Sequence, residues 1–264
     1  LRNVISAYCL HTTSIGYCQG MNFLAGMFLR VYFEANPHDA EVATFSTLIS
    51  VMNSQRHRCG DLFREGLEFP RTILGMHQAL VEEYLPKLAH HMFQSQRVTP
   101  DLYAVSWFLT LFCNLTTLSL FWARRSMDGF LLGGWPSIHR IAIAVLAELE
   151  DCLLEQEFGN ICMTLRKPDG VAVSPSLSLR PSPSILHTNG NKVFQLTHRF
   201  EISSVRLRRL ERDISEARML QSVERMLIEK NAELEREQER IRSDRSRNFP
   251  EAHKSNNICK AHPQ

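Results

Sequence analysis

The chain opens with LRNVISAYCLHTTSIGYCQGMNFLAGMFLRVYF (residues 1–33), in which two helical patterns flank a glycine-containing turn. Apolar residues recur at intervals of three and four on both sides of that turn: Leu1, Val4, Ile5 and Tyr8 before it, and Met21, Leu24, Phe28 and Tyr32 after it. This spacing is that of one face of an α-helix. Gln19 stands between the two patterns, next to Gly20, as a polar residue among apolar ones. It is either a turn residue that satisfies backbone groups or an amide presented to a partner.

The first helical pattern has no start signal. The chain begins with Leu1 rather than Met, and no Ser, Thr, Asp or Asn precedes the pattern to cap a helix. We therefore expect the chain to begin inside a helix, truncated at its N-terminus.

Composition narrows the classes of protein. At 264 residues and 44% hydrophobic the chain can bury a substantial core, and its net charge of +2 favours neither nucleic acid nor an acidic membrane as partner. Its seven cysteines include no C-x-x-C pair, which is typical of a reducing compartment. No apolar run reaches the roughly 18 residues of a membrane-spanning helix. We expect a cytoplasmic protein.

Helical patterns continue to about residue 165. Asn36 and Pro37 form one predicted helix start, and Thr99 and Pro100 form another. The apolar stretch 102–115 is typical of a buried helix. With no convincing period-two strand, the sequence predicts an all-α, multi-helix domain over residues 1–165.

The rest of the chain changes character twice. Residues 166–190 are rich in Pro, Ser and Gly, and are interpreted as a linker or insertion. Helical periodicity returns over 191–243, and we expect its first part to belong to the domain and the remainder to form an extended C-terminal helix. The stretch 199–242 is either a solvated helix docked on the domain or a short coiled coil that recruits a protein partner. Residues 244–264 are expected to be disordered.

Self-sufficient active sites are not indicated. His90 and His91 are adjacent and cannot chelate a metal together from one helix, and His57 and Cys59 have no second pair at ligand spacing. No phosphate-binding glycine motif or nucleophile elbow occurs. The basic residues of 199–212 alternate with acids, which argues against a nucleic-acid surface.

Four blocks in order resemble the TBC domain, the family of GTPase-activating proteins for Rab GTPases. In the first block the family pattern is matched by Ile15, Gly16, Tyr17, Gln19, Gly20, Met21 and Asn22. The segment EYLPKLAHHM and the block SWFLTLFCNL, with Trp107, Phe108, Leu111 and Phe112, follow the family order. In RRSMDGFLLGGW, Arg125 and Asp128 match, whereas Met127 stands where the family usually has Trp.

The resemblance implies that Gln19 is a glutamine finger that orients the hydrolytic water on a Rab. An amide can accept from that water and donate toward a phosphate oxygen at once. Gly16 and Gly20 would let the backbone approach the partner's nucleotide, and Tyr17 and Asn22 would lie on the GTPase-facing side, Tyr17 mainly packing and orienting. Trp107, Phe112, Arg125 and Asp128 are read as structural members of the family motif. GTP and Mg²⁺ would be held by the partner GTPase, so the chain needs no cofactor or metal of its own.

The resemblance also implies a second finger, an arginine from an I-x-x-D-x-x-R motif upstream of the glutamine. No such motif precedes Gln19, and the one upstream arginine, Arg2, belongs to the first helical pattern. An arginine supplied in trans is worth about 10³ to 10⁵ in rate, so this chain alone is expected to be inactive. The alternative is a catalytically inactive Rab-binding or scaffold module in membrane traffic. In either case any membrane contact would be peripheral, on endomembranes and through the GTPase.

Overall fold

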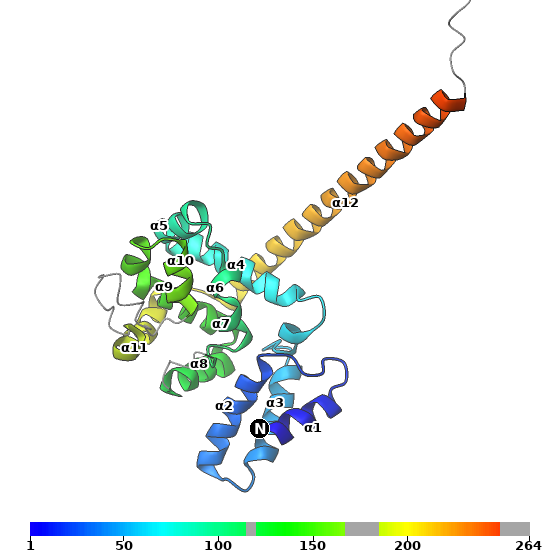
Figure 1. Cartoon of the computed structure of the whole chain (residues 1–264). Helices are drawn as coiled ribbons and strands as arrows, with labels where there is room; N and C mark the ends of the chain where they lie inside the picture. Colours follow the sequence, from blue (N-terminus) through cyan, green and yellow to red (C-terminus); the bar gives the residue numbers. More distant parts are fainter. Residues whose placement is uncertain (115–119, 167–184, 249–264) are drawn as a thin grey trace, which may run out of the picture. The chain divides into compact units, whose positions relative to one another are not determined.

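The computed structural model describes residues 1–114, 120–166 and 185–248, and within these ranges every regular element is helical (Figure 1). The predicted all-α fold class is confirmed. In chain order the elements are α1 (Arg2–His11), α2 (Met21–Ala35), α3 (Ala40–Asn53), η1 (Gly60–Phe63), α4 (Glu68–Tyr84), α5 (Pro86–Ala89), the π-helical η2 (His90–Ser95), α6 (Pro100–Tyr103), α7 (Val105–Leu109), α8 (Leu120–Gly133), α9 (Trp135–Leu154), α10 (Phe158–Arg166), α11 (Ile185–Leu196), η3 (Thr197–Arg199) and α12 (Ser204–Asn248).

The chain divides into two units, Leu1–Ile214 and Ser215–Gln264. The first holds α1 to η3 and the first residues of α12. In the second the described part is the remainder of α12, a helix of 45 residues in total. The predicted C-terminal helix is therefore present.

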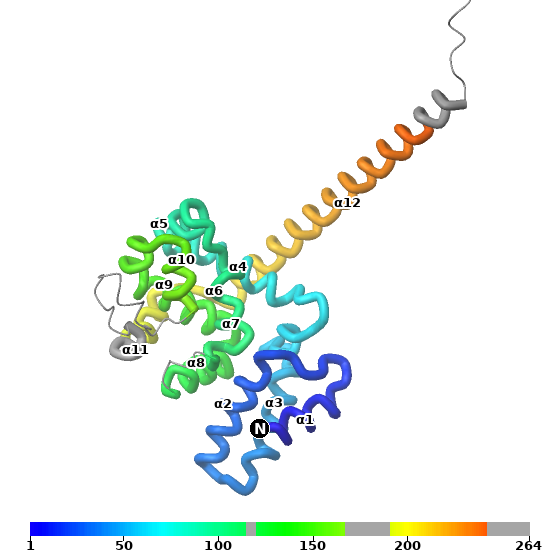
Figure 2. The backbone as a smooth tube through the Cα atoms, in the orientation of Figure 1, coloured from blue at the N-terminus to red at the C-terminus, as the bar shows by residue number. Residues whose placement is uncertain are grey.

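Helices α1, α2 and α3 pack against one another at the start of the first unit (Figure 2). Val4 and Tyr8 of α1 are buried, as are Met21, Leu24 and Phe28 of α2. These residues belong to the two apolar stripes on either side of the glycine turn. Their burial therefore fixes how α1 and α2 pack on the two sides of that turn.

Helix α9 is the central element of the first unit. Helices α4, α8 and α11 all contact it, and most of its residues from Ile138 to Leu153 are buried. One of them, His139, packs against residues of other helices: its ring lies 5.0 Å from that of Phe108 in α7 and 6.3 Å from that of His77 in α4. A helix with so many buried apolar residues is expected at the centre of a helical domain.

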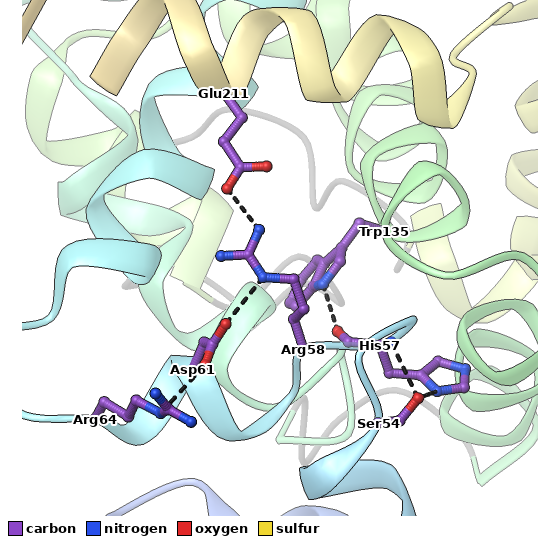
Figure 3. Close-up of polar contacts among 7 residues, drawn as sticks. All are labelled: Ser54, His57, Arg58, Asp61, Arg64, Trp135 and Glu211. Carbon is purple, nitrogen blue, oxygen red and sulfur yellow. Dashed lines mark hydrogen bonds and ion pairs between the residues drawn. The ribbon is translucent and has the colours of Figure 1, made fainter. Parts of the chain in front are cut away.

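The first turns of α12 are anchored to the loop between α3 and α4 (Figure 3). Arg58, in the left-handed region with φ 48°, donates from Nη1 to Glu211 at 2.6 Å and from Nε to Asp61 at 2.9 Å. The same loop accepts a hydrogen bond from Trp135, whose Nε1 lies 2.7 Å from the carbonyl oxygen of His57. The loop thus joins the start of α9 to the start of α12.

Two of the predicted helix features are wrong. The helix expected to start at Asn36 begins at Ala40 instead, because the Asn36 side chain donates to Asp39 at 2.7 Å and accepts from the His38 N–H at 3.2 Å, which closes a turn. The helix expected over 102–115 is interrupted after Leu109. Leu111 and Phe112 both have positive φ there, and the Phe112 N–H bonds to the Trp107 carbonyl oxygen at 2.8 Å.

The C-terminal boundaries also differ from expectation. Helix α11 starts at Ile185, inside the stretch 166–190 interpreted as a linker, and α12 runs to Asn248, inside the stretch 244–264 expected to be disordered. Residues 167–184 and 249–264 lie outside the described residues. Within the described ranges no helix combines the length and the hydropathy needed to cross a membrane.

Candidate functional site

The turn between α1 and α2 depends on two glycines with positive φ. Gly16 has φ +64° and Gly20 has φ +115°, conformations that residues with a Cβ rarely adopt. The Gly16 N–H donates to the Thr12 carbonyl oxygen at 3.3 Å, so the chain turns immediately after α1. Gly20 then precedes the first residue of α2.

Gly20 is also held by its neighbours. Its N–H donates to Oδ1 of Asn22 at 3.2 Å. A Cβ placed on Gly20 would lie 3.3 Å from the ring of Phe63 and 3.4 Å from the carbonyl oxygen of Leu109. The turn is therefore fixed by one side-chain hydrogen bond and by close approach to η1 and α7.

Gln19 and Tyr17 face solvent, whereas Cys18 between them is partly buried against the core. Among the described residues the Gln19 amide has no hydrogen-bond partner. Within the described part of the chain the side chain therefore makes no hydrogen bond to backbone groups of the turn, and its role as an amide presented to a partner stays a prediction. Tyr17 is 57% exposed, so its ring is not part of the buried core, and its expected place on the GTPase-facing side stays a prediction.

Trp107 and Phe112 are fully buried and form part of one aromatic cluster. The Trp107 ring lies 5.4 Å from that of Phe112 and 5.2 Å from that of Tyr103, and its Nε1 donates to the Leu165 carbonyl oxygen at 3.3 Å. These contacts tie α7 to the end of α10. Both residues are thus core residues, placed on either side of the Leu109 that touches Gly20.

Arg125 and Asp128 both lie on α8 with exposed side chains. The Arg125 guanidinium carbon sits 5.3 Å from the centre of the Phe194 ring and 5.7 Å from that of Phe121, which is the geometry of a cation–π contact. Met127, which occupies the place of the family's usual Trp, is buried. Arg125 therefore joins α8 to α11, and Asp128 has no comparable contact among the described residues.

The structure brings Gly16, Tyr17, Gln19, Gly20 and Asn22 together simply because they share one turn. Sequence reasoning missed the two residues that pack beneath it, Phe63 and Leu109. Leu109 belongs to the SWFLTLFCNL block but is not one of its motif letters, and nothing in the sequence distinguishes Phe63 from other apolar residues.

The buried thiols of the core are not candidates for nucleophilic chemistry. Burial raises the pKa of Cys59 to about 12 and likewise raises the pKa of Cys113 to about 12. A thiol must ionise to act as a nucleophile, so both remain protonated at neutral pH. What the site presents at its surface is an uncharged amide on a rigid turn.

The chain is similar to known Rab-GTPase-activating proteins and their TBC domains. The model of the Rab-GTPase-TBC domain family matches residues 1–154. A Drosophila melanogaster protein, the ecotropic viral integration site 5 ortholog, is 36% identical over 154 residues, which are 58% of this chain and 18% of that protein. The Caenorhabditis elegans Rab GTPase-activating protein eat-17 is 29% identical over 213 residues, or 81% of this chain and 21% of that protein. The chain therefore spans about a fifth of the length of these relatives.

Two solved structures share the fold. The Chlamydomonas flagellar RabGAP TBC domain superposes with a TM-score of 0.53 at 22% identity, covering 74% of this chain and 56% of that one. The Ypt/Rab-GAP domain of Gyp1p gives 0.54 at 17% identity, covering 75% and 64%. With a family model that matches more than half of its residues, the chain belongs to the Rab-GTPase-TBC domain family.

Proposed function

We propose that this chain is part of a GTPase-activating protein for a Rab-family GTPase and that Gln19 orients the water that attacks the γ-phosphate. The observation that carries the proposal is an exposed amide, without a partner among the described residues, on a turn held by Gly16 and Gly20. Family membership supports the GTPase as partner. GTP and Mg²⁺ would be bound by that GTPase.

The chemistry of the amide suits this role. Its oxygen can accept a hydrogen bond from the water while its NH₂ donates to a phosphate oxygen, which places the nucleophile in line. A fixed turn serves this purpose better than a mobile one, because orientation is lost if the donor and acceptor are not held in advance. The hydrogen bond from Gly20 to Asn22 provides that fixation on the C-terminal side of Gln19.

The complementary arginine is assigned to a motif upstream of the glutamine, and no such motif lies among the residues that precede Gln19 in this sequence. We therefore propose that the chain binds its GTPase but does not accelerate hydrolysis by itself. A catalytically inactive Rab-binding or scaffold module is the second candidate. On either view the protein acts in the cytoplasm and reaches endomembranes through the GTPase.

The test compares hydrolysis with binding. Single-turnover GTP hydrolysis is measured across a panel of Rabs with the longest product of the gene that contains this chain, and capture of GDP–aluminium fluoride-loaded Rab is measured with the chain itself. An activator accelerates GTP hydrolysis by at least one Rab, and Gln19→Ala reduces the accelerated rate by about 10²-fold. The matched control is Gln55→Ala, which removes the same exposed amide elsewhere.

Each outcome has a distinct meaning. Capture of the Rab without acceleration of hydrolysis by any product supports the inactive binding module. If the protein shows no capture and no acceleration, both candidates are contradicted. Acceleration that survives Gln19→Ala unchanged contradicts the role of Gln19 but not that of the protein.

We propose in addition that the stretch 199–242 provides a protein-binding surface separate from the GTPase contact. Apolar side chains on its second half are solvent-exposed, and exposed apolar surface of this kind marks interaction sites.

A further inference from the structure

The second unit carries an apolar stripe along one side of α12. Five of the exposed aliphatic side chains of α12 follow one line along the helix: Leu220 (70%), Val223 (41%), Leu227 (59%), Leu234 (52%) and Ile241 (58%). On a straight helix these five and the intervening Asn231 and Gln238 project within about 40° of Leu227. We call these seven residues the seam.

From the seam we propose that this segment of α12 pairs with α12 of a second copy of the chain, in parallel, as a two-stranded coiled coil. The steps along the seam are three, four, four, three, four and three residues, which is the spacing of a coiled-coil core with one stutter between Leu227 and Asn231. A mostly polar helix is marginal in water without tertiary packing, so burial of the seam supplies the missing stabilisation.

The polar members of the seam favour identical chains in parallel. In that arrangement each seam residue meets its own counterpart, so Asn231 faces Asn231 and Gln238 faces Gln238, where amides can bond to each other. A single buried Asn in a coiled-coil core is known to fix register in this way. If the heptad pattern continued without the stutter, the core positions would be 230 and 237 instead of 231 and 238. Lys230 would then face Lys230 of the second copy, and Glu237 would face Glu237.

The flanking charges discriminate between orientations. In the parallel pair Lys230 lies beside Glu235 of the second copy, and the same opposite-charge pair forms again by symmetry. In the antiparallel register that best joins apolar residues, with Leu227 opposite Leu234, Lys230 instead lies beside Lys230 of the second copy. Like charges so placed are destabilising, and the second copy is therefore expected to lie parallel.

The proposal is independent of the GTPase contact and is tested by the oligomeric state of the full chain. Sedimentation equilibrium is expected to show a reversible dimer. Leu227→Lys should weaken the dimer at least about tenfold, equivalent to about 1.4 kcal/mol, since it places two cations in the seam. The matched control is Ile228→Lys, because Ile228 is equally exposed but projects about 100° away; it should change the dissociation constant by less than about twofold.

Orientation has its own measurement. Oxidation of Leu234→Cys followed by peptide mapping should give a Cys-to-Cys link between the two 234 positions. Circular dichroism of each variant verifies that helix content is retained, which is expected because Lys is a good helix former. A wild-type chain that stays monomeric, or a dimer equally insensitive to both lysine substitutions, overturns the proposal. A dimer without the 234 link overturns its parallel orientation.

Discussion

The side chain of Asn22 accepts a hydrogen bond from the backbone N–H of Gly20, with a distance of 3.2 Å between the nitrogen and Oδ1. The bond spans the step from the turn into α2 and is adjacent to Gln19. We predict that Asn22→Ala, in the longest product of the gene that contains this chain, lowers the rate of stimulated GTP hydrolysis by about 2- to 10-fold, the value of one hydrogen bond, while affinity for the GTP-bound Rab is unchanged. Asn22→Asp keeps the acceptor and should retain most of the rate. An equal loss in both variants would show that the acceptor is not what matters.

Gly20→Ala tests the packing under the turn. Its Cβ would meet Phe63 at 3.3 Å and the Leu109 carbonyl at 3.4 Å, at a φ of +115° that alanine rarely adopts. We expect a loss of about 1–3 kcal/mol in the free energy of unfolding, measured by urea denaturation, together with loss of stimulated hydrolysis.

Gly66→Ala is the matched control for strain alone. Gly66 also has positive φ, +84°, but nothing lies within 4 Å of its Cβ position. It should destabilise the fold less than Gly20→Ala and leave hydrolysis intact. Loss of hydrolysis in both variants would mean that reduced stability, rather than the turn, explains the effect.

The buried imidazoles predict acid sensitivity. Burial lowers the pKa of His139 from 6.5 to about 3, and burial together with the neighbouring His139 lowers the pKa of His77 well below 6.5. Neither ring nitrogen of His139 has a hydrogen-bond partner among the described residues, so the buried ring is neutral in the folded state. The unfolded chain then binds more protons below pH 6.5, and stability falls as pH decreases through that value.

For His139 the expected loss between pH 7 and pH 5 is about 2 kcal/mol. It is measured by urea unfolding at the two pH values. His139→Leu removes the group that titrates and should make stability depend less on pH, while His198→Leu, on an exposed histidine, should leave the dependence as it is. A pH dependence identical in all three proteins would contradict this account.

The pair of Arg58 and Glu211 predicts that the first turns of α12 stabilise the first unit. Both groups are partly exposed, so water screens the charges, and Glu211→Gln should reduce the free energy of unfolding by only about 0.5–1 kcal/mol. Glu224→Gln is the control, since Glu224 is exposed in the second unit. Equal effects of the two substitutions on urea unfolding would refute a specific role for Glu211.

Local signals were sufficient for much of the fold and of the site. The apolar stripes around Leu24 and Tyr8 predict the first two helices, and the pairing of Gly16 with Gly20 predicts the turn that exposes Gln19. Both depend on residues within a few positions of one another, where periodicity and backbone preference determine the structure.

What sequence reasoning could not reach depends on distant contacts. Arg58 and Glu211 are 153 residues apart, and either could have been a solvated surface charge. Leu111 and Phe112 look like helix formers, yet both take positive φ, and the Phe112 ring packs against that of Trp107. Asn36 was misread because its side chain can close a turn as readily as it can cap a helix.

Helix α12 runs without interruption from Ser204, inside the first unit, to Asn248, inside the second. Two chains joined along the seam would consequently carry two Gln19 turns in one assembly. On a membrane that displays many copies of a GTPase, the second engagement would become intramolecular, governed by effective concentration instead of bulk concentration. A weak contact between one turn and one GTPase would then give the dimer a long residence time on the membrane. Helix α12 would determine the avidity, and the Gln19 turn would provide the catalytic amide.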